Sequence, residues 1–147
     1  MILISHRGNT NGKQSELENM PEYIDNAIKL GYDVEVDIRF KSGKFYLGHD
    51  NSKCGISLDW LKHRSSKLWL HCKNMQAIEQ LSIMSIYNYF WHNSDAVTIT
   101  SRGYIWMSSK IKPLKNSIAV IPELTDYNLK ECAGICSDNI EVYNERY

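Results

Sequence analysis

A run of alternating side chains at residues 32–40 constrains the fold of this chain more than any other segment. Apolar residues fall on one face of the predicted strand, whereas Glu35 and Asp37 fall on the other. Residues 68–73 repeat the alternation. Because the apolar faces of such strands pack against helices, their polar faces are predicted to point into the mouth of a barrel.

Strand-like and helix-like segments alternate in the first half of the chain, which predicts parallel βα units and the α/β fold class. In the helix predicted at 18–30, Asn19 is the expected N-cap, Pro21 fits the first turn and Gly31 ends the helix. The second half predicts short strands with almost no helices between them. The predicted segments are strands at 2–6, 32–40, 44–47, 68–73, 89–91, 96–98, 104–107, 117–121 and 134–137, and helices at 18–30, 57–61, 74–89 and 126–132.

The length of 147 residues predicts a single domain, and a hydrophobic content of 43% is sufficient for a core. Lys+Arg and Asp+Glu both number 17, and this balance argues against nucleic acid as a partner. No apolar run is long enough to cross a bilayer, so we expect no stable membrane insertion. Met1 leads into the first apolar run without a signal-peptide pattern, which predicts a cytoplasmic location. We therefore expect reduced thiols at Cys54, Cys72, Cys132 and Cys136.

Several residues suggest phosphate chemistry. His6 and Arg7 follow the first predicted strand; histidine suits proton transfer near neutral pH, and arginine suits a phosphate clamp. Glu35 and Asp37 would repel each other inside a barrel mouth unless a cation lay between them, and oxygen ligands favour Mg²⁺, Ca²⁺ or Mn²⁺. Taken singly, each group is also compatible with a structural role, such as a carboxylate face paired with Arg39.

Taken together, these residues resemble the motif series of the glycerophosphodiester phosphodiesterase family. The match is specific over residues 6–73 and weaker at 134–138. It consists of His6-Arg7-Gly8, Glu18-Asn19, Ala27 with Gly31, Glu35 with Asp37, Gly48-His49-Asp50, Lys73 and the final Gly134-Ile135-Cys136-Ser137-Asp138.

The resemblance implies a TIM-like (β/α) barrel, here compact and reduced, with shortened or missing helices in the second half. It also implies metal-dependent hydrolysis of a glycerophosphodiester-type substrate, and with it a role in lipid metabolism. The site residues that it implies are His6 and His49 as the acid–base pair, Glu35 and Asp37 as ligands of a divalent metal ion, and Arg7 and Lys73 as contacts to the substrate phosphate.

Two departures from the family pattern affect this prediction. His71 stands where the family has a glutamate as third metal ligand. Imidazole can take that role, and it would either move the preference from Mg²⁺ or Ca²⁺ toward Mn²⁺ or Zn²⁺ or weaken binding. The chain is also shorter than the roughly 200 residues that a complete barrel needs. The family's insertion after His49-Asp50 is missing, which predicts a more open site.

Two other functions remain open. A related phospholipase D-like lipid phosphodiesterase would use a similar metal-centred site with two histidines. A degenerate barrel would instead bind a phosphate ligand or a protein partner without turnover. The helix-poor stretch 90–121 would leave apolar strand faces bare, and such faces usually become interfaces, so we also expect a homo-oligomer.

Overall fold

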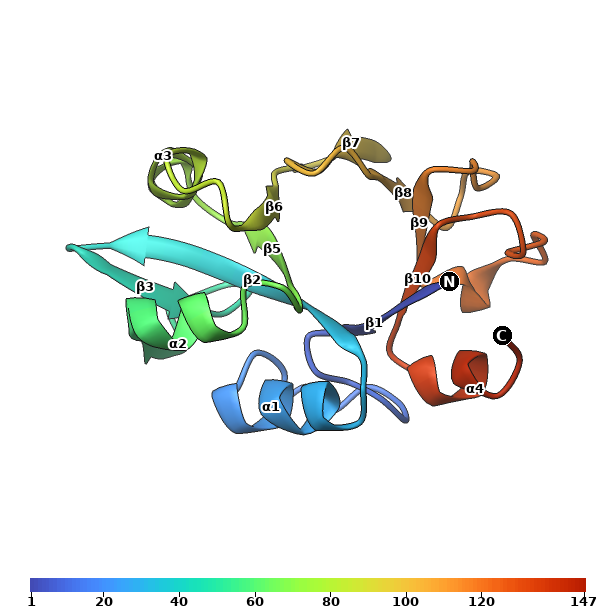
Figure 1. Ribbon diagram of the computed structural model, residues 1–147, viewed down its shortest axis with the longest axis horizontal. Helices are drawn as coiled ribbons and strands as arrows, with labels where there is room; N and C mark the ends of the chain where they lie inside the picture. Colours follow the sequence, from blue (N-terminus) through green and yellow to red (C-terminus); the bar gives the residue numbers. More distant parts are fainter.

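The computed structural model describes residues 1–147, which form a mixed α/β structure around one ten-stranded sheet (Figure 1). The strands are β1 (Ile2–His6), β2 (Asp33–Lys41), β3 (Lys44–Leu47), β4 (Cys54–Ile56), β5 (Leu68–Cys72), β6 (Asn88–Phe90), β7 (Val97–Ile99), β8 (Ile105–Ser108), β9 (Ser117–Val120) and β10 (Gly134–Ser137). The helices are α1 (Pro21–Lys29), α2 (Leu58–His63), α3 (Met75–Ser82) and α4 (Ile140–Asn144), with the 3₁₀ turn η1 (Pro122–Leu124).

Seven parallel strands form the centre of the curved sheet. Strands β6, β5, β2, β1, β10, β9 and β8 lie side by side in that sequence, and each is parallel to its neighbours. Strand β7 runs antiparallel to β8, while β3 and β4 extend β2 into an antiparallel ribbon. The predicted α/β class and parallel βα units are therefore confirmed.

The expected closed barrel is wrong, because no strand ladder joins β6 to β7. These strands have only three residues each, and β7 runs antiparallel to the adjacent β8. A backbone hydrogen bond from the Ser101 N–H to the Tyr89 carbonyl (2.8 Å) bridges the gap, and so does a side-chain hydrogen bond from the Thr98 hydroxyl to the Trp91 carbonyl (2.8 Å). The fold is an open, curled sheet and not a TIM barrel.

The alternation predicted for β2 and β5 is confirmed, and it creates a core on each face of the sheet. Apolar residues of both strands pack outward against α1, α2 and α3; this outer core includes Ile24, Ala27, Val34, Val36, Ile38, Leu61, Leu68, Leu70, Ala77 and Leu81. Six strands contribute to the inner core, which contains Ile4, Trp69, Phe90, Trp106, Ile118 and Cys136. The inner face is thus filled by side chains along most of its length, and polar groups collect where the strands end.

Several predicted boundaries differ from the structure. The helix predicted at 126–132 is wrong: only Leu129 and Cys132 of that segment are buried, which is too small an apolar stripe to hold a helix against the sheet. The helix that begins after Asn74 ends at Ser82, well before the predicted limit near residue 89. Strand β4, η1 and α4 were not predicted, and each is five residues or shorter.

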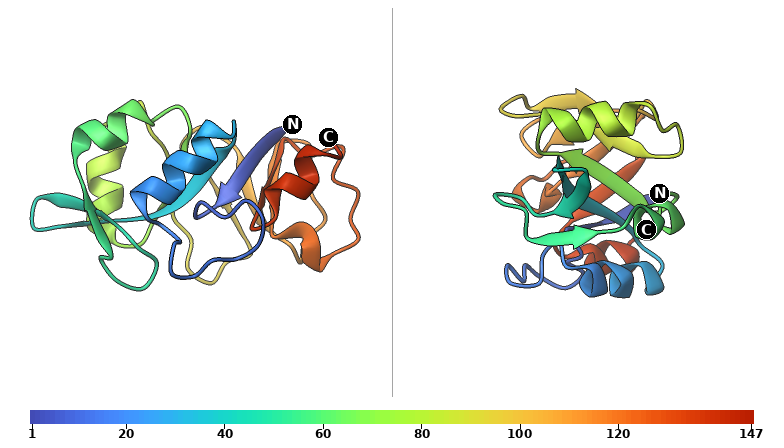
Figure 2. Two further views of the ribbon diagram at one scale, coloured as in Figure 1. Left: turned by 90° about the horizontal axis from the view of Figure 1, so that it is seen from below. Right: turned by 90° about the vertical axis from the view of Figure 1, so that its left-hand side faces the viewer.

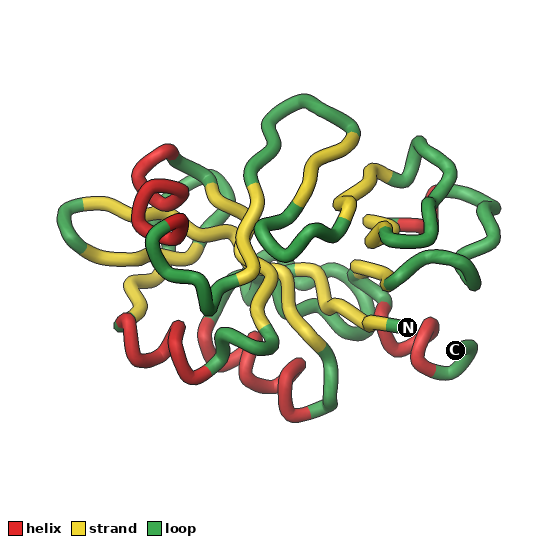
Figure 3. The backbone as a smooth tube through the Cα atoms, turned by 45° about the horizontal axis from the view of Figure 1, so that its top comes forward, coloured by secondary structure: helices red, strands yellow, loops and turns green.

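The helices are unevenly distributed. Figure 3 shows that the later strands are joined mostly by loops, as expected for the second half of the chain. Helix α4 packs on β1 and β10, and it brings the two chain ends close together in both views of Figure 2. No helix is long and apolar enough to cross a membrane. All four cysteines carry free thiols, as predicted.

Candidate metal and phosphate site

The strand register brings the predicted site residues to one edge of the sheet. Parallel pairing places His6 at the end of β1 opposite Glu35 on β2, and Asp37 opposite His71 on β5. Lys73 follows β5 directly, and its N–H donates to the Ile38 carbonyl (2.8 Å). Because parallel strands end at the same edge, these side chains lie together at the carboxyl ends of the strands.

Glu35 and Asp37 are almost fully buried, with exposed fractions of 1% and 0%. Oδ2 of Asp37 lies 2.9 Å from both Asn19 Nδ2 and Arg7 Nε. Burial raises the pKa of Asp37, but His71, Arg7 and Asn19 outweigh this and hold the pKa well below its usual range. One oxygen of each carboxylate, Glu35 Oε2 and Asp37 Oδ1, has no hydrogen-bond partner.

His71 faces both carboxylates. Its Nδ1 lies 3.5 Å from Glu35 Oε1 and 3.4 Å from Asp37 Oδ1, while its Nε2 lies 3.4 Å from the His92 carbonyl. A carbonyl only accepts, so Nε2 carries a proton, and the neutral ring therefore offers its lone pair at Nδ1, toward the carboxylates. Burial lowers the pKa of His71, but the carboxylates of Asp37 and Glu35 outweigh burial and raise it to about 9.

These three residues fit a divalent cation. Each offers one ligand atom, and the three atoms lie within 4.8 Å of one another. The oxygens of Glu35 and Asp37 that accept no hydrogen bond are the more telling observation, since a buried carboxylate oxygen without a hydrogen bond is costly unless a cation compensates it. Two carboxylates and one imidazole form a donor set that also accepts Mn²⁺ or Zn²⁺.

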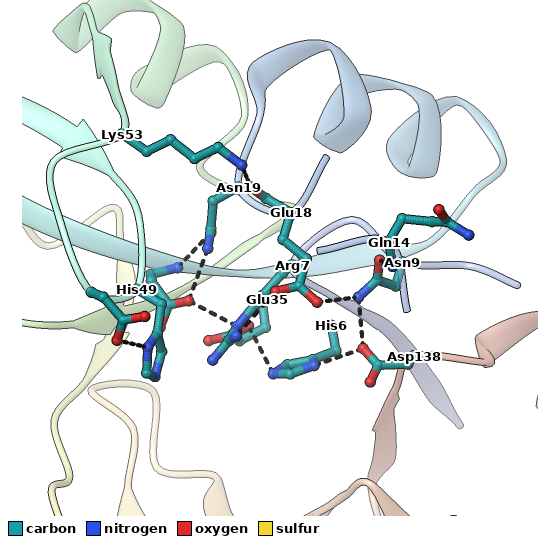
Figure 4. A network of polar contacts seen from close by, with 12 residues as sticks. His6, Arg7, Asn9, Gln14, Glu18, Asn19, Glu35, His49, Lys53 and Asp138 are labelled. Carbon is teal, nitrogen blue, oxygen red and sulfur yellow. Dashed lines mark hydrogen bonds and ion pairs between the residues drawn. The ribbon is translucent and has the colours of Figure 1, made fainter. Parts of the chain in front are cut away.

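His6 is oriented by a carboxylate from the far end of the chain. Its Nδ1 lies 2.8 Å from Asp138 Oδ1, which leaves Nε2 facing Glu35 Oε2 at 3.8 Å (Figure 4). Burial lowers the pKa of His6, but the hydrogen bond to Asp138 and the charge of Glu35 outweigh burial and raise the pKa above 6.5. The side chain of Asn9 donates to Asp138 Oδ1 (2.7 Å), so this carboxylate is itself held in place.

Two residues of the site adopt left-handed backbone conformations that are uncommon for side chains other than glycine. Arg7 has φ 56° and Asn19 has φ 61°. They are held by hydrogen bonds from the Arg7 N–H to the Glu35 carbonyl (2.9 Å) and from the Asn19 N–H to the Arg7 carbonyl (3.1 Å). This geometry corrects the prediction for Asn19, which does not cap α1: its side chain instead binds both the backbone N–H and the carboxylate of Asp37.

Arg7 and Lys73, the two predicted phosphate contacts, both lie near the carboxylates but differ in the contacts that they make there. Arg7 lies 3.1 Å from Glu18 Oε2 in addition to its contact with Asp37. Lys73 Nζ lies 4.0 Å from Asp37 Oδ1, at the limit of an ion pair. Arg7 retains further N–H groups on its planar guanidinium, so both cations can reach a phosphoryl group next to the carboxylates.

The side chain of His49 is more exposed than those of the other predicted site residues. Its side chain is 41% exposed and Nδ1 lies 2.7 Å from Asp50 Oδ1, in the loop between β3 and β4. Arg39 holds that loop in place by donating hydrogen bonds to the carbonyl groups of Gly48 and His49. His49 and Arg7 line the same cavity of about 390 Å³ (Figure 4), so the loop places this histidine beside the site and leaves its ring exposed.

Sequence reasoning did not assign roles to Asn9, His92 or Asp138. Asp138 ends the 134–138 motif noted in the sequence, so a signal for it existed. His92 and Asn9 are in loops and belong to no pattern in the sequence. The largest cavity, about 690 Å³, lies outside the sheet between the β3–β4 ribbon and α3, and no residue of the site lines it.

Comparison with known proteins identifies no family for this chain. No protein-family model matches the sequence, and neither the curated proteins nor the solved structures contain a match. Any function assigned to this chain therefore depends on the chemistry of the site itself.

Proposed function

We propose that this protein is a metal-dependent phosphoric diester hydrolase with glycerophosphodiester phosphodiesterase-like chemistry. The observation that carries the proposal is the pair of oxygens on Glu35 and Asp37 that accept no hydrogen bond, buried beside His71 and flanked by Arg7 and Lys73. A site with ligands for a cation and separate cations for an anion is suited to a metal-bound phosphate.

Each residue has a role in this proposal. Glu35, Asp37 and His71 would hold a divalent cation, and this cation would stabilise the negative charge that develops on the phosphoryl oxygens. Arg7 and Lys73 bind the remaining phosphoryl oxygens and orient the diester. The buried setting of the carboxylates strengthens these interactions, because little water competes for them.

His6 is the better placed of the two acid–base candidates. Asp138 fixes its tautomer, so Nε2 can accept a proton from an attacking hydroxyl as that oxygen bonds to phosphorus. The second imidazole, His49, would donate a proton to the departing alkoxide as the P–O bond breaks. The attacker is either water or a neighbouring hydroxyl of the substrate. His49 can serve only if its ring turns from Asp50 toward the site.

The proposal also specifies a class of substrate and a cellular role. A glycerophosphodiester-type substrate fits a small polar cavity beside Arg7, and a cytoplasmic role in lipid metabolism remains a prediction. A phospholipase D-like lipid phosphodiesterase would use the same residues on a different head group.

A non-catalytic phosphate-binding protein is the second candidate, and one observation favours it. His71 lies near both carboxylates with its pKa raised to about 9, so at neutral pH the protonated ring already compensates part of their charge without a metal. In that case the site would bind an anion through Arg7 and Lys73 and show no turnover.

Turnover of a generic diester separates the two candidates. Chelator-treated protein would be assayed with bis(4-nitrophenyl) phosphate after addition of Mn²⁺, Mg²⁺ or Ca²⁺. The proposal predicts turnover that requires metal and is lost in Glu35→Gln. Glu79→Gln, an exposed substitution on α3, is the control and should retain full activity. Equal rates in Glu35→Gln and wild type, or no turnover with any of the metals, would contradict it.

A further inference from the structure

Two cavities of opposite character adjoin the candidate site. The polar cavity beside Arg7 has no apolar residue in its lining and includes Lys13 and Lys53. A second cavity of about 310 Å³ is lined by five apolar residues, Ala96, Trp106, Val120, Ile121 and Leu124, and by four polar ones, His92, Asp95, Ser108 and Ser109. The two cavities share no residue.

The second cavity belongs to the same functional edge of the sheet. The ring of His92 stacks on that of His71 with centroids 4.5 Å apart, and His71 in turn faces both carboxylates. Ser108 ends β8 and Val120 ends β9, and both strands run parallel to those that carry the site. A group held in this cavity would therefore lie next to the proposed phosphate position.

The wall of this cavity is held in a fixed shape. Ile121 has φ 49°, an unfavourable conformation for a β-branched residue, and its N–H donates to the Cys136 carbonyl (2.8 Å). Two residues later, Glu123 accepts a hydrogen bond from the Ser137 hydroxyl and links η1 to β10. Trp106, only 5% exposed, also lines the cavity and packs on Phe90 with centroids 4.5 Å apart.

We propose that the cavity beside His92 binds an apolar ester arm of the substrate, while the polar cavity beside Arg7 binds a hydroxylated arm. This inference rests on the proposed function and specifies its substrate class: an amphiphilic phosphodiester with one polar and one apolar substituent. A cavity of about 310 Å³ is at the small end of ligand sites, which suits a short alkyl or aryl group.

The test compares two diesters with the same reacting chemistry. Glycerol-phospho-ethanol and glycerol-phospho-hexanol both release a primary alcohol, and they differ by four methylene groups. Each fully buried methylene contributes roughly fourfold to binding, so we expect kcat/KM for the hexyl diester to exceed that for the ethyl diester at least about tenfold. Leu124→Glu, at a cavity-lining position that is 74% exposed, places a charge beside the hexyl chain and should lower this ratio severalfold.

Ile83→Glu is the matched control, because Ile83 is 78% exposed and lines only the outer cavity. A hexyl-to-ethyl ratio of kcat/KM near 1 in the wild type, or a ratio unchanged in Leu124→Glu, would overturn the binding of an apolar arm in this cavity. The proposed hydrolase activity would still stand. Replacing the glycerol group by a propyl group in the hexyl diester should lower kcat/KM at least about tenfold. Equal rates for the two diesters would overturn the assignment of the polar cavity to a hydroxylated arm. Absence of turnover with every diester and metal overturns the proposed function and this inference with it.

Discussion

Asp138 determines which nitrogen of His6 is available for chemistry. It holds Nδ1 at 2.8 Å, so Nε2 alone faces the carboxylate of Glu35. The same contact stabilises the protonated form: burial by itself lowers the pKa of His6, but the hydrogen bond to Asp138 and the charge of Glu35 outweigh burial and raise it. An imidazole oriented in this way can exchange protons with a substrate oxygen without first reorienting.

Removal of His6 should therefore affect turnover far more than folding. We expect His6→Ala to lower kcat for a diester roughly 10²-fold or more. His63→Ala, which removes an exposed histidine at the end of α2, should leave kcat unchanged. Circular dichroism would establish that both variants are folded. If His6→Ala turned over at close to the wild-type rate, this residue would have no part in proton transfer.

His71 makes metal binding depend on pH. Since its pKa is raised to about 9, the ring is protonated in the metal-free protein at neutral pH, and a metal ion must displace that proton. Affinity for Mg²⁺ or Mn²⁺ should therefore rise as the pH is raised from 6 to 8. In His71→Glu we expect tighter Mg²⁺ binding with a flatter pH dependence, measured by calorimetric titration at both pH values. Identical titrations of the two proteins would make His71 a packing residue.

At the scale of elements, one side chain joins α3 to the strand that carries the carboxylates. Asn74 accepts hydrogen bonds from the N–H groups of Ala77 and Phe40, both at 3.1 Å, and donates to the Phe40 carbonyl at 2.8 Å. It is thus both the N-cap of α3 and a clamp on the end of β2.

Loss of this clamp should destabilise the protein more than loss of an ordinary cap. We expect Asn74→Ala to lower the free energy of unfolding by about 2–3 kcal/mol, since it leaves two backbone groups of Phe40 without partners as well as uncapping the helix. Ser57→Ala, which removes only the cap of α2, should cost about 1 kcal/mol. Urea denaturation measures both, and equal losses would show that the link to β2 contributes little.

The inward direction of Glu35, Asp37 and His71 could be predicted because alternation along a strand depends only on the backbone. The pairing of His6 with Asp138 could not, because 132 residues separate them and the contact exists only once β1 lies beside β10. The role of Asn19 was missed for a related reason: its position before a helix is typical of a cap, and only the folded chain brings Asp37 within its reach.

At the scale of the whole molecule, the open seam between β6 and β7 leaves β7 with an unpaired edge. Val97 and Ile99 on this strand are 40% and 67% exposed. Whether the seam stays open could not be predicted from the sequence, because closure depends on the length and direction of three-residue strands. An exposed apolar edge strand is a ready site for pairing with another chain.

The homo-oligomer was predicted from bare apolar strand faces at 90–121, and this edge offers a specific interface for it. At tens of micromolar, the wild type should sediment as a dimer or larger species, and Ile99→Lys should sediment as a monomer because a charge on an edge strand opposes pairing. Ile83→Lys, an equally accessible substitution away from the seam, should leave the oligomer intact. A wild type that is a single monomeric species at this concentration would rule out the interface.

The central claim is that the buried carboxylates of β2 form a site for one divalent cation. Calorimetric titration of chelator-treated protein with Mn²⁺ at pH 8 tests it most directly. We predict one binding event per chain in the wild type and in the exposed control Asp59→Asn, and its loss in Asp37→Asn. The absence of saturable Mn²⁺ binding in the wild type, or undiminished binding in Asp37→Asn, would contradict the account.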